Sequence, residues 1–395
     1  MVSHSHFAKV FFAFMAMLIV PLSGLSIDIY VPSLPAVGQY FHVSKSLVQL
    51  SITTYMIGLG MIQLFAGSFS DSFGRKKPFL ISMVIFLIAT FFIPASNTIY
   101  QLLFLRFIQG AALGAMVAPM RSVIPDLFEG DDYHKMMTYM VMAWSIGPII
   151  APAIGGYLQH YFGWKANFYF LGSYSAVGFL LILFFLPETS THRHRFHLGD
   201  IFQRNLTILS NRMYIRNVIM NGLLYSILIL FSTVGPFLIQ TVLHYSAIQF
   251  GHIALLIGLA WFLGTMTNRF LIAAPQDQKI KFSLSAMLII SLSMVFAAIA
   301  HPMNLFIIAL PVFLLAWCAG FLFPTYVSQA ISLFPTMTGS ANSLFGAVAF
   351  SIAGLGSALG ALLKSGTQLP LALTFVVLVT LCIGMQFVRC RQAAY

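Results

Sequence analysis

The segment Leu25-Ser-Ile-Asp-Ile-Tyr-Val-Pro-Ser-Leu-Pro35 lies at the end of the first long apolar run of the chain, Phe7 to Val31. A run of about twenty apolar residues is long enough for one helix to cross the hydrocarbon core of a membrane. The segment adds one carboxylate, Asp28, to a run that otherwise holds no acid. Because an ionisable group inside a bilayer is costly, we interpret Asp28 as a functional group.

The composition indicates a membrane protein. Hydrophobic residues make up 59% of the 395 residues and charged residues 7%, and the mean hydropathy is +0.91. A soluble domain of this size needs far more charge on its surface. The apolar stretches are about twenty residues long and lack the alternation of short β-strands, so helices are expected and a β-barrel is not. Phe7 to Val31 is too long for a removable signal peptide. The sequence therefore predicts an all-α polytopic membrane protein.

About twelve apolar stretches are separated by connections that are mostly short. The predicted spans are residues 7–34, 47–71, 78–95, 99–124, 137–158, 167–186, 217–241, 249–272, 280–300, 304–330, 339–363 and 369–388. One longer, basic connection, Pro187 to Arg216, follows the sixth span. We expect an N-terminal six-helix bundle in residues 1–186, a cytoplasmic basic linker in residues 187–216 and a C-terminal six-helix bundle in residues 217–395, arranged as two parallel repeats around a central site.

The net charge of +11 is unevenly distributed. Outside the spans, fifteen Lys and Arg residues fall in loops on one side, whereas three, Lys45, Lys165 and Lys364, fall on the other. By the positive-inside rule, both termini and the basic loops are expected in the cytoplasm. Topology and contact with anionic membrane lipids explain the charge, so a nucleic-acid partner is not expected.

Arg106 is the residue that we expect to pair with Asp28. The fourth span is predicted to run inward, which places Arg106 about two helical turns below the outer face, near the depth of Asp28. Opposite charges at one depth in a low-dielectric interior should pair, because each alone carries a desolvation cost. Gly110 and Gly114 follow at intervals of four residues, so a neighbouring helix is expected to pack closely on this face. A static ion pair with only a structural role is the alternative.

The connection after the second span carries a candidate gate made of Gly67, Asp71, Gly74 and Arg75. Asp71 is expected to accept hydrogen bonds from the N-terminus of the eleventh span, where the helix dipole is positive. Arg75 is expected to pair with Asp126, just after the fourth span.

The fifth span contains small residues and prolines in a regular pattern. Gly147, Ala151 and Gly155 recur every four residues and predict a flat face for tight packing. Pro148 and Pro152 remove backbone donors and bend the helix. Such a helix is structural in most membrane proteins, but between two halves it also suits an interface that rocks.

Aromatic residues in the spans are candidates for substrate binding, although core packing or lipid contact is the commoner role for each. These candidates are Tyr30, Tyr55, Tyr139, Trp144, Tyr225, Trp261 and Trp317. Together they suit lipophilic, weakly polar compounds.

Other chemistries are not expected. His192, His194 and His197 lie in a basic tract without nearby Cys or paired carboxylates, so no metal site is predicted. Cys318 and Cys382 lie in spans, which argues against a disulfide framework. The sequence holds no recognisable nucleophile–base set or phosphate loop, so neither an enzyme nor a cofactor is expected, and a proton gradient would be the energy source.

The motifs together resemble the major facilitator superfamily, and within it the twelve-span drug:proton antiporter branch and its Bcr/CflA group of multidrug efflux transporters. The similar stretches are Asp28-x-Tyr30-x-Pro32-xx-Pro35, Gly67-xxx-Asp71-xx-Gly74-Arg75-Lys76, Arg106-xx-Gln109-Gly110 and Gly147-Pro148-xx-Ala151-Pro152-xx-Gly155-Gly156. They lie almost wholly in the first half of the chain. Ser72 departs from the pattern, because a basic residue is usual after the motif aspartate.

The resemblance implies a secondary active transporter in a bacterial inner membrane, acting as a monomer that exports small lipophilic compounds or drugs in exchange for protons. Asp28 would be the protonatable residue and Arg106 its modulator, while Asp71, Arg75 and Asp126 would form a gate. Two alternatives stay open. One is a dedicated exporter or importer of a single metabolite or siderophore on the same fold, and the other is a membrane sensor that transports nothing.

Overall fold

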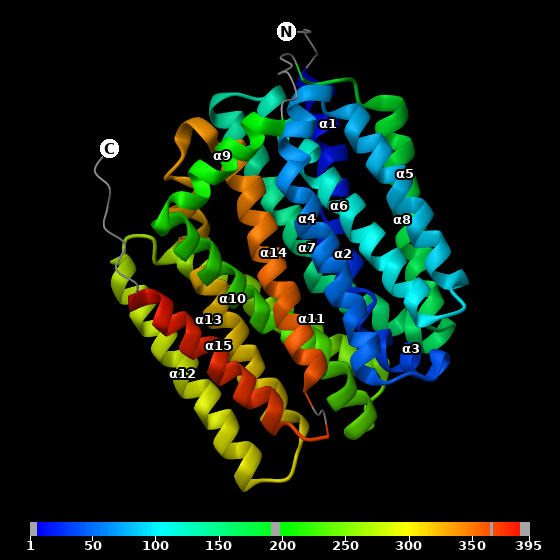
Figure 1. The fold of residues 1–395 in the computed structure, drawn as a ribbon, viewed down its shortest axis with the longest axis vertical. Helices are drawn as coiled ribbons and strands as arrows, with labels where there is room; N and C mark the ends of the chain where they lie inside the picture. Colours follow the sequence, from blue (N-terminus) through cyan, green and yellow to red (C-terminus); the bar gives the residue numbers. More distant parts are fainter. Residues whose placement is uncertain (1–5, 191–197, 364–365, 388–395) are drawn as a thin grey trace.

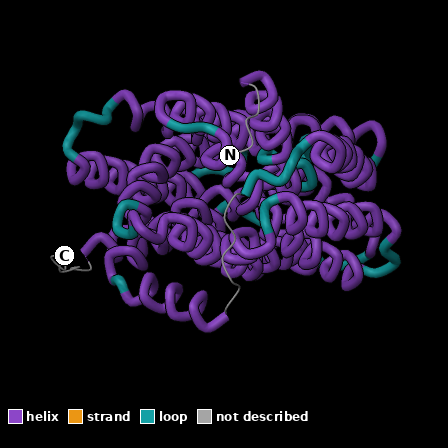
Figure 2. Tube along the Cα trace, turned by 90° about the horizontal axis from the view of Figure 1, so that it is seen from above, coloured by secondary structure: helices purple, strands orange, loops and turns teal. Residues whose placement is uncertain are grey.

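Apolar helices build nearly all of the computed structural model, which describes residues 6–190, 198–363 and 366–387 (Figure 1). Within these ranges there is no β-strand, and 12 helical segments are long and apolar enough to cross a membrane. Seen from above, the helices stand side by side with loops at their ends (Figure 2). The predicted all-α fold with twelve spans is confirmed.

The first half, residues 6–190, contains six spans. They are formed by α1 (His6–Ile19), α2 (Leu22–Asp28), η1 (Val31–Ser33) and α3 (Leu34–Phe41) together, then α4 (Lys45–Phe73), α5 (Lys76–Phe92) with η2 (Ile93–Ala95), α6 (Ile99–Leu127), α7 (Gly130–Phe162) and α8 (Trp164–Phe185). The second half, residues 198–387, contains the rest. It consists of α9 (Leu198–Ser210), α10 (Arg212–Pro236) with the π-helical η3 (Phe237–Val242), α11 (Ala247–Phe270), α12 (Gln276–Ala300), α13 (Leu305–Ile331), η4 (Pro335–Met337), α14 (Thr338–Leu362) and α15 (Leu369–Phe387).

The first span is broken, whereas the sequence predicted one continuous helix over residues 7–34. The helix α1 ends at Ile19, and α2 begins after Pro21, which has no backbone N–H to continue the ladder. The short α2 then ends at Asp28 and is followed by a 3₁₀ turn. Asp28 therefore lies at the C-terminal end of a short helix inside the span.

The connection between the halves is also more ordered than the predicted linker over residues 187–216. It contains the helix α9, which buries Ile201 and Ile208 and packs against α10 and α14. The seventh span begins at Arg212, five residues before the predicted start. Apolar side chains on one face of a helix explain why this segment folds back onto the bundle.

Two pairs of long helices join the halves. The helix α4 packs along α14, and α7 packs along α11, whereas most other contacts stay within one half. The loops after α4, α6 and α8 lie at the same end as the N-terminus, which we call the basic end because it carries Arg75, Lys76 and Arg212 (Figure 1). The opposite end is called the far end.

Polar caps fix where several spans begin at the far end. The side chains of Ser44, Thr98, Ser246 and Asn304 each accept a hydrogen bond from a backbone N–H in the first turn of α4, α6, α11 and α13. Each cap satisfies an amide that the helix itself leaves unpaired, so the register of these helices is set at their first residue.

Candidate functional site

Asp28 lies half-buried at the break in the first span. It forms no hydrogen bond and no ion pair with any other residue in the described part of the chain. It lies close enough to Tyr55 of α4 and Tyr225 of α10 to interact with both electrostatically. Because these tyrosines come from the two halves, Asp28 faces the region between them.

Arg106 of α6 is fully buried, with an exposed fraction of 0%. Its Nη1 donates hydrogen bonds to the carbonyl oxygen of Ser26 at 3.0 Å and to Oε1 of Gln109 at 2.6 Å. The guanidinium carbon lies 4.3 Å from the ring centroid of Tyr55 and 5.1 Å from that of Tyr30. Neutral acceptors and aromatic faces therefore surround this cation.

The predicted ion pair between Asp28 and Arg106 is wrong for this structure. Arg106 instead uses the backbone carbonyl of Ser26, two residues before Asp28 on α2. Meanwhile Nε and Nη2 of Arg106 are buried without a hydrogen-bond partner. These neighbouring nitrogens form one edge of the planar guanidinium fork, the geometry that binds a carboxylate with two hydrogen bonds.

The close approach predicted at the glycines of α6 is present. A side chain at Gly110 would meet the backbone carbonyl of Tyr55, and one at Gly114 would meet that of Leu59. On the facing helix, Gly58 lies against the carbonyl of Phe107. The backbones of α4 and α6 therefore touch, and this contact brings the Tyr55 ring over Arg106.

The predicted contact between Arg75 and Asp126 is present at the basic end. Nε of Arg75 lies 3.1 Å from Oδ2 of Asp126, and its Nη1 donates to Oγ of Ser70 at 3.0 Å. The same carboxylate oxygen accepts a hydrogen bond from Oγ1 of Thr189 at 3.0 Å. The network thus ties the ends of α4 and α6 to the segment after α8.

Sequence reasoning missed Glu188 in this network. Its Oε1 accepts from the backbone N–H of Arg75 at 2.7 Å, and its Oε2 accepts from that of Lys76 at 3.2 Å. The carboxylate thereby caps the N-terminus of α5, where the helix dipole favours negative charge. Gly74 has φ +90°, and a side chain there would collide with Glu188. The only signal in the sequence was an acid directly after the sixth span.

One face of α4, which carries Gly60, Gln63 and Gly67, packs against α14. Gly60 lies against Ser351, Gly67 lies against Ser343, and Gln63 lies against Gly346. These contacts agree with the predicted approach of the eleventh span. The side chain of Asp71 is not among those that the structure describes, so its contact with the start of α14 stays a prediction.

The helix α7 packs against both the first span and the second half. Gly147 and Gly155 lie against the backbone carbonyls of Pro21 and Ile29, which brackets the α2 segment that ends at Asp28. On another face, the carbonyl of Pro152 lies close to Gly251 of α11. Pro148 packs against Gly24 of α2. A shift of α11 against α7 would therefore also displace the α2 segment that ends at Asp28.

The seven aromatic candidates do not form one group. Tyr30 and Tyr55 lie against Arg106, while Tyr225 and Trp261 have ring centroids 6.1 Å apart in the second half. Trp317 stacks on Phe321, Trp144 donates to Oγ of Ser23 at 2.7 Å, and the Tyr139 side chain is 53% exposed. Of the seven, Tyr55 and Tyr225 are the two that interact electrostatically with Asp28.

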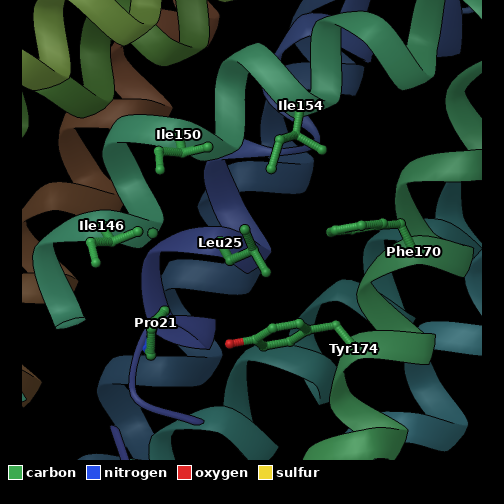
Figure 3. Close-up of a pocket in the computed structure, with 8 residues that line it drawn as sticks. Pro21, Leu25, Ile146, Ile150, Ile154, Phe170 and Tyr174 are labelled. Carbon is green, nitrogen blue, oxygen red and sulfur yellow. The ribbon is translucent and has the colours of Figure 1, made fainter. Parts of the chain in front are cut away.

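An apolar cavity of about 200 Å³ lies between α2, α7 and α8. Figure 3 shows Leu25 and Pro21 facing Phe170 and Tyr174 across it. The Tyr174 hydroxyl donates to the carbonyl oxygen of Leu18, beside the break between α1 and α2. Neither Asp28 nor Arg106 lines this cavity, so it is separate from the charged site.

No group of three or more His, Cys, Asp or Glu residues could hold a metal ion within the part of the chain that the structure describes. His192, His194 and His197 lie outside the described residues.

The hydrogen bonds between the halves lie toward the far end. Gln49 donates to the carbonyl oxygen of Thr233 at 2.8 Å, and Oγ1 of Thr53 donates to Oγ of Ser357 at 3.1 Å. Gln240 donates to the carbonyl oxygen of Pro32 at 2.9 Å.

Comparison with known proteins adds an independent observation. A sequence model described as Major Facilitator Superfamily matches residues 16–360. A bicyclomycin resistance protein homolog of Haemophilus influenzae is 32% identical over 189 residues, which cover 48% of each chain. The multidrug resistance protein MdtL of Shewanella oneidensis is 25% identical over 313 residues, covering 78% of this chain and 77% of that protein.

The chain spans about half the length of the first of these curated relatives. Among solved structures, a D-xylose–proton symporter superposes with a TM-score of 0.76 at 16% identity, covering 99% of this chain and 100% of that one. At this level of identity the likeness shows the fold alone.

Proposed function

This chain belongs to the Major Facilitator Superfamily, and we propose that it is a proton-coupled antiporter that exports small lipophilic compounds by alternating access. Its similarity to bicyclomycin and multidrug resistance proteins supports the drug:proton antiporter branch. The observation that carries the proposal is the separation of two groups. Asp28 forms no ion pair within the part of the chain that the structure describes, and Nε and Nη2 of Arg106 have no hydrogen-bond partner there.

The two side chains define two charge states of the site. A carboxylate that is half-buried without a counterion is costly in its charged form, so the present arrangement suits protonated Asp28. Loss of the proton creates a carboxylate for which the free Nε and Nη2 of Arg106 are matched donors. Pairing requires α2 to turn or Arg106 to release Ser26. The proton would therefore select between two arrangements of the first span.

The packing of α7 offers a route from that change to the halves. The helix α7 contacts the α2 segment on one face and α11 on another. A turn of α2 would therefore change how α7 packs against α11, at the interface between the halves. The present state has hydrogen bonds between the halves toward the far end. It corresponds to a transporter closed at the far end, and alternating access would open that end.

Orientation and location follow from charge. The chain is a multi-pass membrane protein, and we place its basic end in the cytoplasm by the positive-inside rule. A bacterial inner membrane, cytoplasmic termini and a monomeric state complete the proposal. Protons, membrane lipids and a small-molecule substrate are the expected partners, without a cofactor.

The substrate class follows from the groups around Asp28. Tyr55 and Tyr225 interact electrostatically with the carboxyl group, and the ring centroid of Tyr225 lies 6.1 Å from that of Trp261 and 5.8 Å from that of Phe350. Aromatic side chains bind lipophilic molecules by burying apolar surface, and this kind of contact accepts molecules of many shapes. The rival substrate is a single metabolite or siderophore, which the same experiment distinguishes.

Proton movement in proteoliposomes tests the proposal. A fluorescent lipophilic cation, a neutral lipophilic antimicrobial and a hydroxamate siderophore would be supplied separately under an imposed pH gradient. We expect gradient-driven flux of the lipophilic compounds in the wild type and its loss in Asp28→Asn. Asp132→Asn is the matched control, because Asp132 is an exposed acid that pairs only at the surface with Lys135.

Each outcome has a defined meaning. Flux of the siderophore alone would replace multidrug export by dedicated export. Equal gradient-driven flux in the wild type and in Asp28→Asn would contradict a coupling role for Asp28. Absence of any coupled flux would contradict the antiporter itself.

A further inference from the structure

A chain of buried hydrogen bonds runs from Arg106 to α5. Nη1 of Arg106 donates to Oε1 of Gln109 at 2.6 Å, and Nε2 of Gln109 donates to Oγ1 of Thr90 at 2.7 Å. The Thr90 hydroxyl in turn donates to the carbonyl oxygen of Phe86 at 2.6 Å. Arg106, Gln109 and Thr90 each have an exposed fraction of 0%, so water cannot replace any of these partners.

The direction of each bond in the chain is fixed from both ends. A guanidinium only donates, so the atom of Gln109 that faces Arg106 must be its oxygen. A hydroxyl has one proton, and Thr90 uses it on Phe86, as threonines in helices commonly do. Thr90 must therefore accept from Gln109, which presents its NH₂ group. The two requirements agree and allow one orientation of the amide.

We propose that Thr90 is a positioning residue for proton coupling, which it serves by holding the Gln109 amide oxygen toward Arg106. With both protons of Nη1 occupied by Ser26 and Gln109, the guanidinium keeps its plane and presents the Nε and Nη2 edge unpaired. Thr90 is linked to Arg106 through Gln109. The inference rests on the proposed proton coupling. It adds Thr90 as the residue that helps to keep Arg106 apart from Asp28 in this state.

Removal of the Thr90 hydroxyl has a definite consequence for Asp28. In Thr90→Val, Gln109 Nε2 loses a buried acceptor, so the amide is held in place only by its bond from Arg106. Ser26 is then the one fixed acceptor of Nη1, so the release of Ser26 that pairing with Asp28 requires becomes easier, and exchange is expected to continue at lower pH. The other titratable groups that interact with this pair are Tyr30, Tyr55 and Tyr225, from the first span, α4 and α10.

The pH dependence of gradient-driven exchange tests this role. We expect Thr90→Val to shift the pH of half-maximal exchange downward by roughly one unit, a tenfold change in proton concentration. Thr90→Ser keeps the hydroxyl and should retain the wild-type profile. Thr380→Val is the matched control, because Thr380 donates to the carbonyl oxygen of Val376 in the same way but is exposed on α15.

The experiment can refute the role of Thr90 while leaving the proposed antiport intact. A wild-type pH profile in Thr90→Val, measured where Asp28→Asn abolishes coupling, would refute the role of Thr90 alone. Wild-type coupling in Asp28→Asn would refute the proposed function first. If Thr90→Val is not recovered folded, Thr90→Ala removes the same hydroxyl and is held to the same expectation. A shift shared by Thr90→Ser would also count against the hydroxyl.

Discussion

Arg106 is a single buried charge that has neutral hydrogen-bond partners on one nitrogen and two further nitrogens available to bind a carboxylate. Moving a guanidinium out of water costs roughly several kcal/mol, even after the surrounding protein relaxes. Two neutral acceptors and the rings of Tyr30 and Tyr55 offset part of that cost. A carboxylate on the free edge would offset more. The residue is therefore stable here and more stable beside an ionised Asp28, which is the asymmetry that coupling requires.

Glu188 carries a prediction at the same scale. In Glu188→Gln, one carboxylate oxygen becomes an NH₂ group that faces a backbone N–H of α5, so one capping bond is lost together with the favourable charge at the helix N-terminus. We expect a loss of about 1 kcal/mol of stability, seen as a lower midpoint of thermal unfolding in detergent.

Glu129→Gln is the control for this substitution. Glu129 is the residue directly before α7, and its side chain makes no capping hydrogen bond. An equal loss of stability in both variants would show that the geometry of Glu188 contributes nothing beyond its charge.

Residue-level reasoning from the sequence found the charged groups but not their relation. Asp28 and Arg106 stood out because polar groups are rare in apolar spans, and depth alone suggested that they pair. Depth does not determine how a helix is rotated about its axis, and the backbone carbonyl of Ser26 meets Arg106 instead. Thr90 gave no signal, because a threonine in an apolar helix usually bonds to its own backbone. Its role as an acceptor depends on which residue lies opposite.

At the scale of helices, glycine contacts decide how α4 and α6 pack. The spacing of Gly110 and Gly114 predicted a close neighbour, and the structure identifies it as α4. Gly110→Ala would place a methyl group against the backbone carbonyl of Tyr55, which has no freedom to move aside. We expect a loss of about 1–3 kcal/mol, measured as a lower thermal midpoint in detergent.

Gly384→Ala provides the comparison, because nothing lies within 4 Å of a side chain at that position of α15. Alanine forms helices more readily than glycine, so this variant should be neutral or slightly stabilising. If Gly110→Ala behaves in the same way, the backbones of α4 and α6 are not in contact.

Helices were predictable from the sequence to the extent that length and apolarity define them. Twelve spans follow from hydropathy, but the break in the first span does not, because the hydropathy of the run stays high enough for one span across Pro21. The helix α9 was missed for the opposite reason. It lies in a basic connection, and only the burial of Ile201 and Ile208 against α10 and α14 makes its apolar face useful.

At the scale of the whole molecule, buried hydrogen bonds cross the seam between the halves. Toward the far end it contains a buried set of hydroxyls, in which Ser357 of α14 lies 3.1 Å from Thr53 of α4 and 3.0 Å from Thr233 of α10. Polar contacts buried between two moving bodies stabilise the state in which they form, because separation leaves each group to find a new partner. This set therefore biases the molecule toward closure at the far end.

The double substitution Thr53→Val with Ser357→Ala removes that bias while leaving the apolar packing of the seam. We expect the population open at the far end to rise about fivefold, since the net value of one hydrogen bond is about 1 kcal/mol. Spin labels at Asn97 and His301, exposed positions at the far end of the two halves, would report this as a larger fraction of long distances. Thr374→Val, which removes a hydroxyl bonded only within α15, should leave the distribution unchanged. Equal distributions in the double variant and the wild type would mean that apolar packing alone closes the far end.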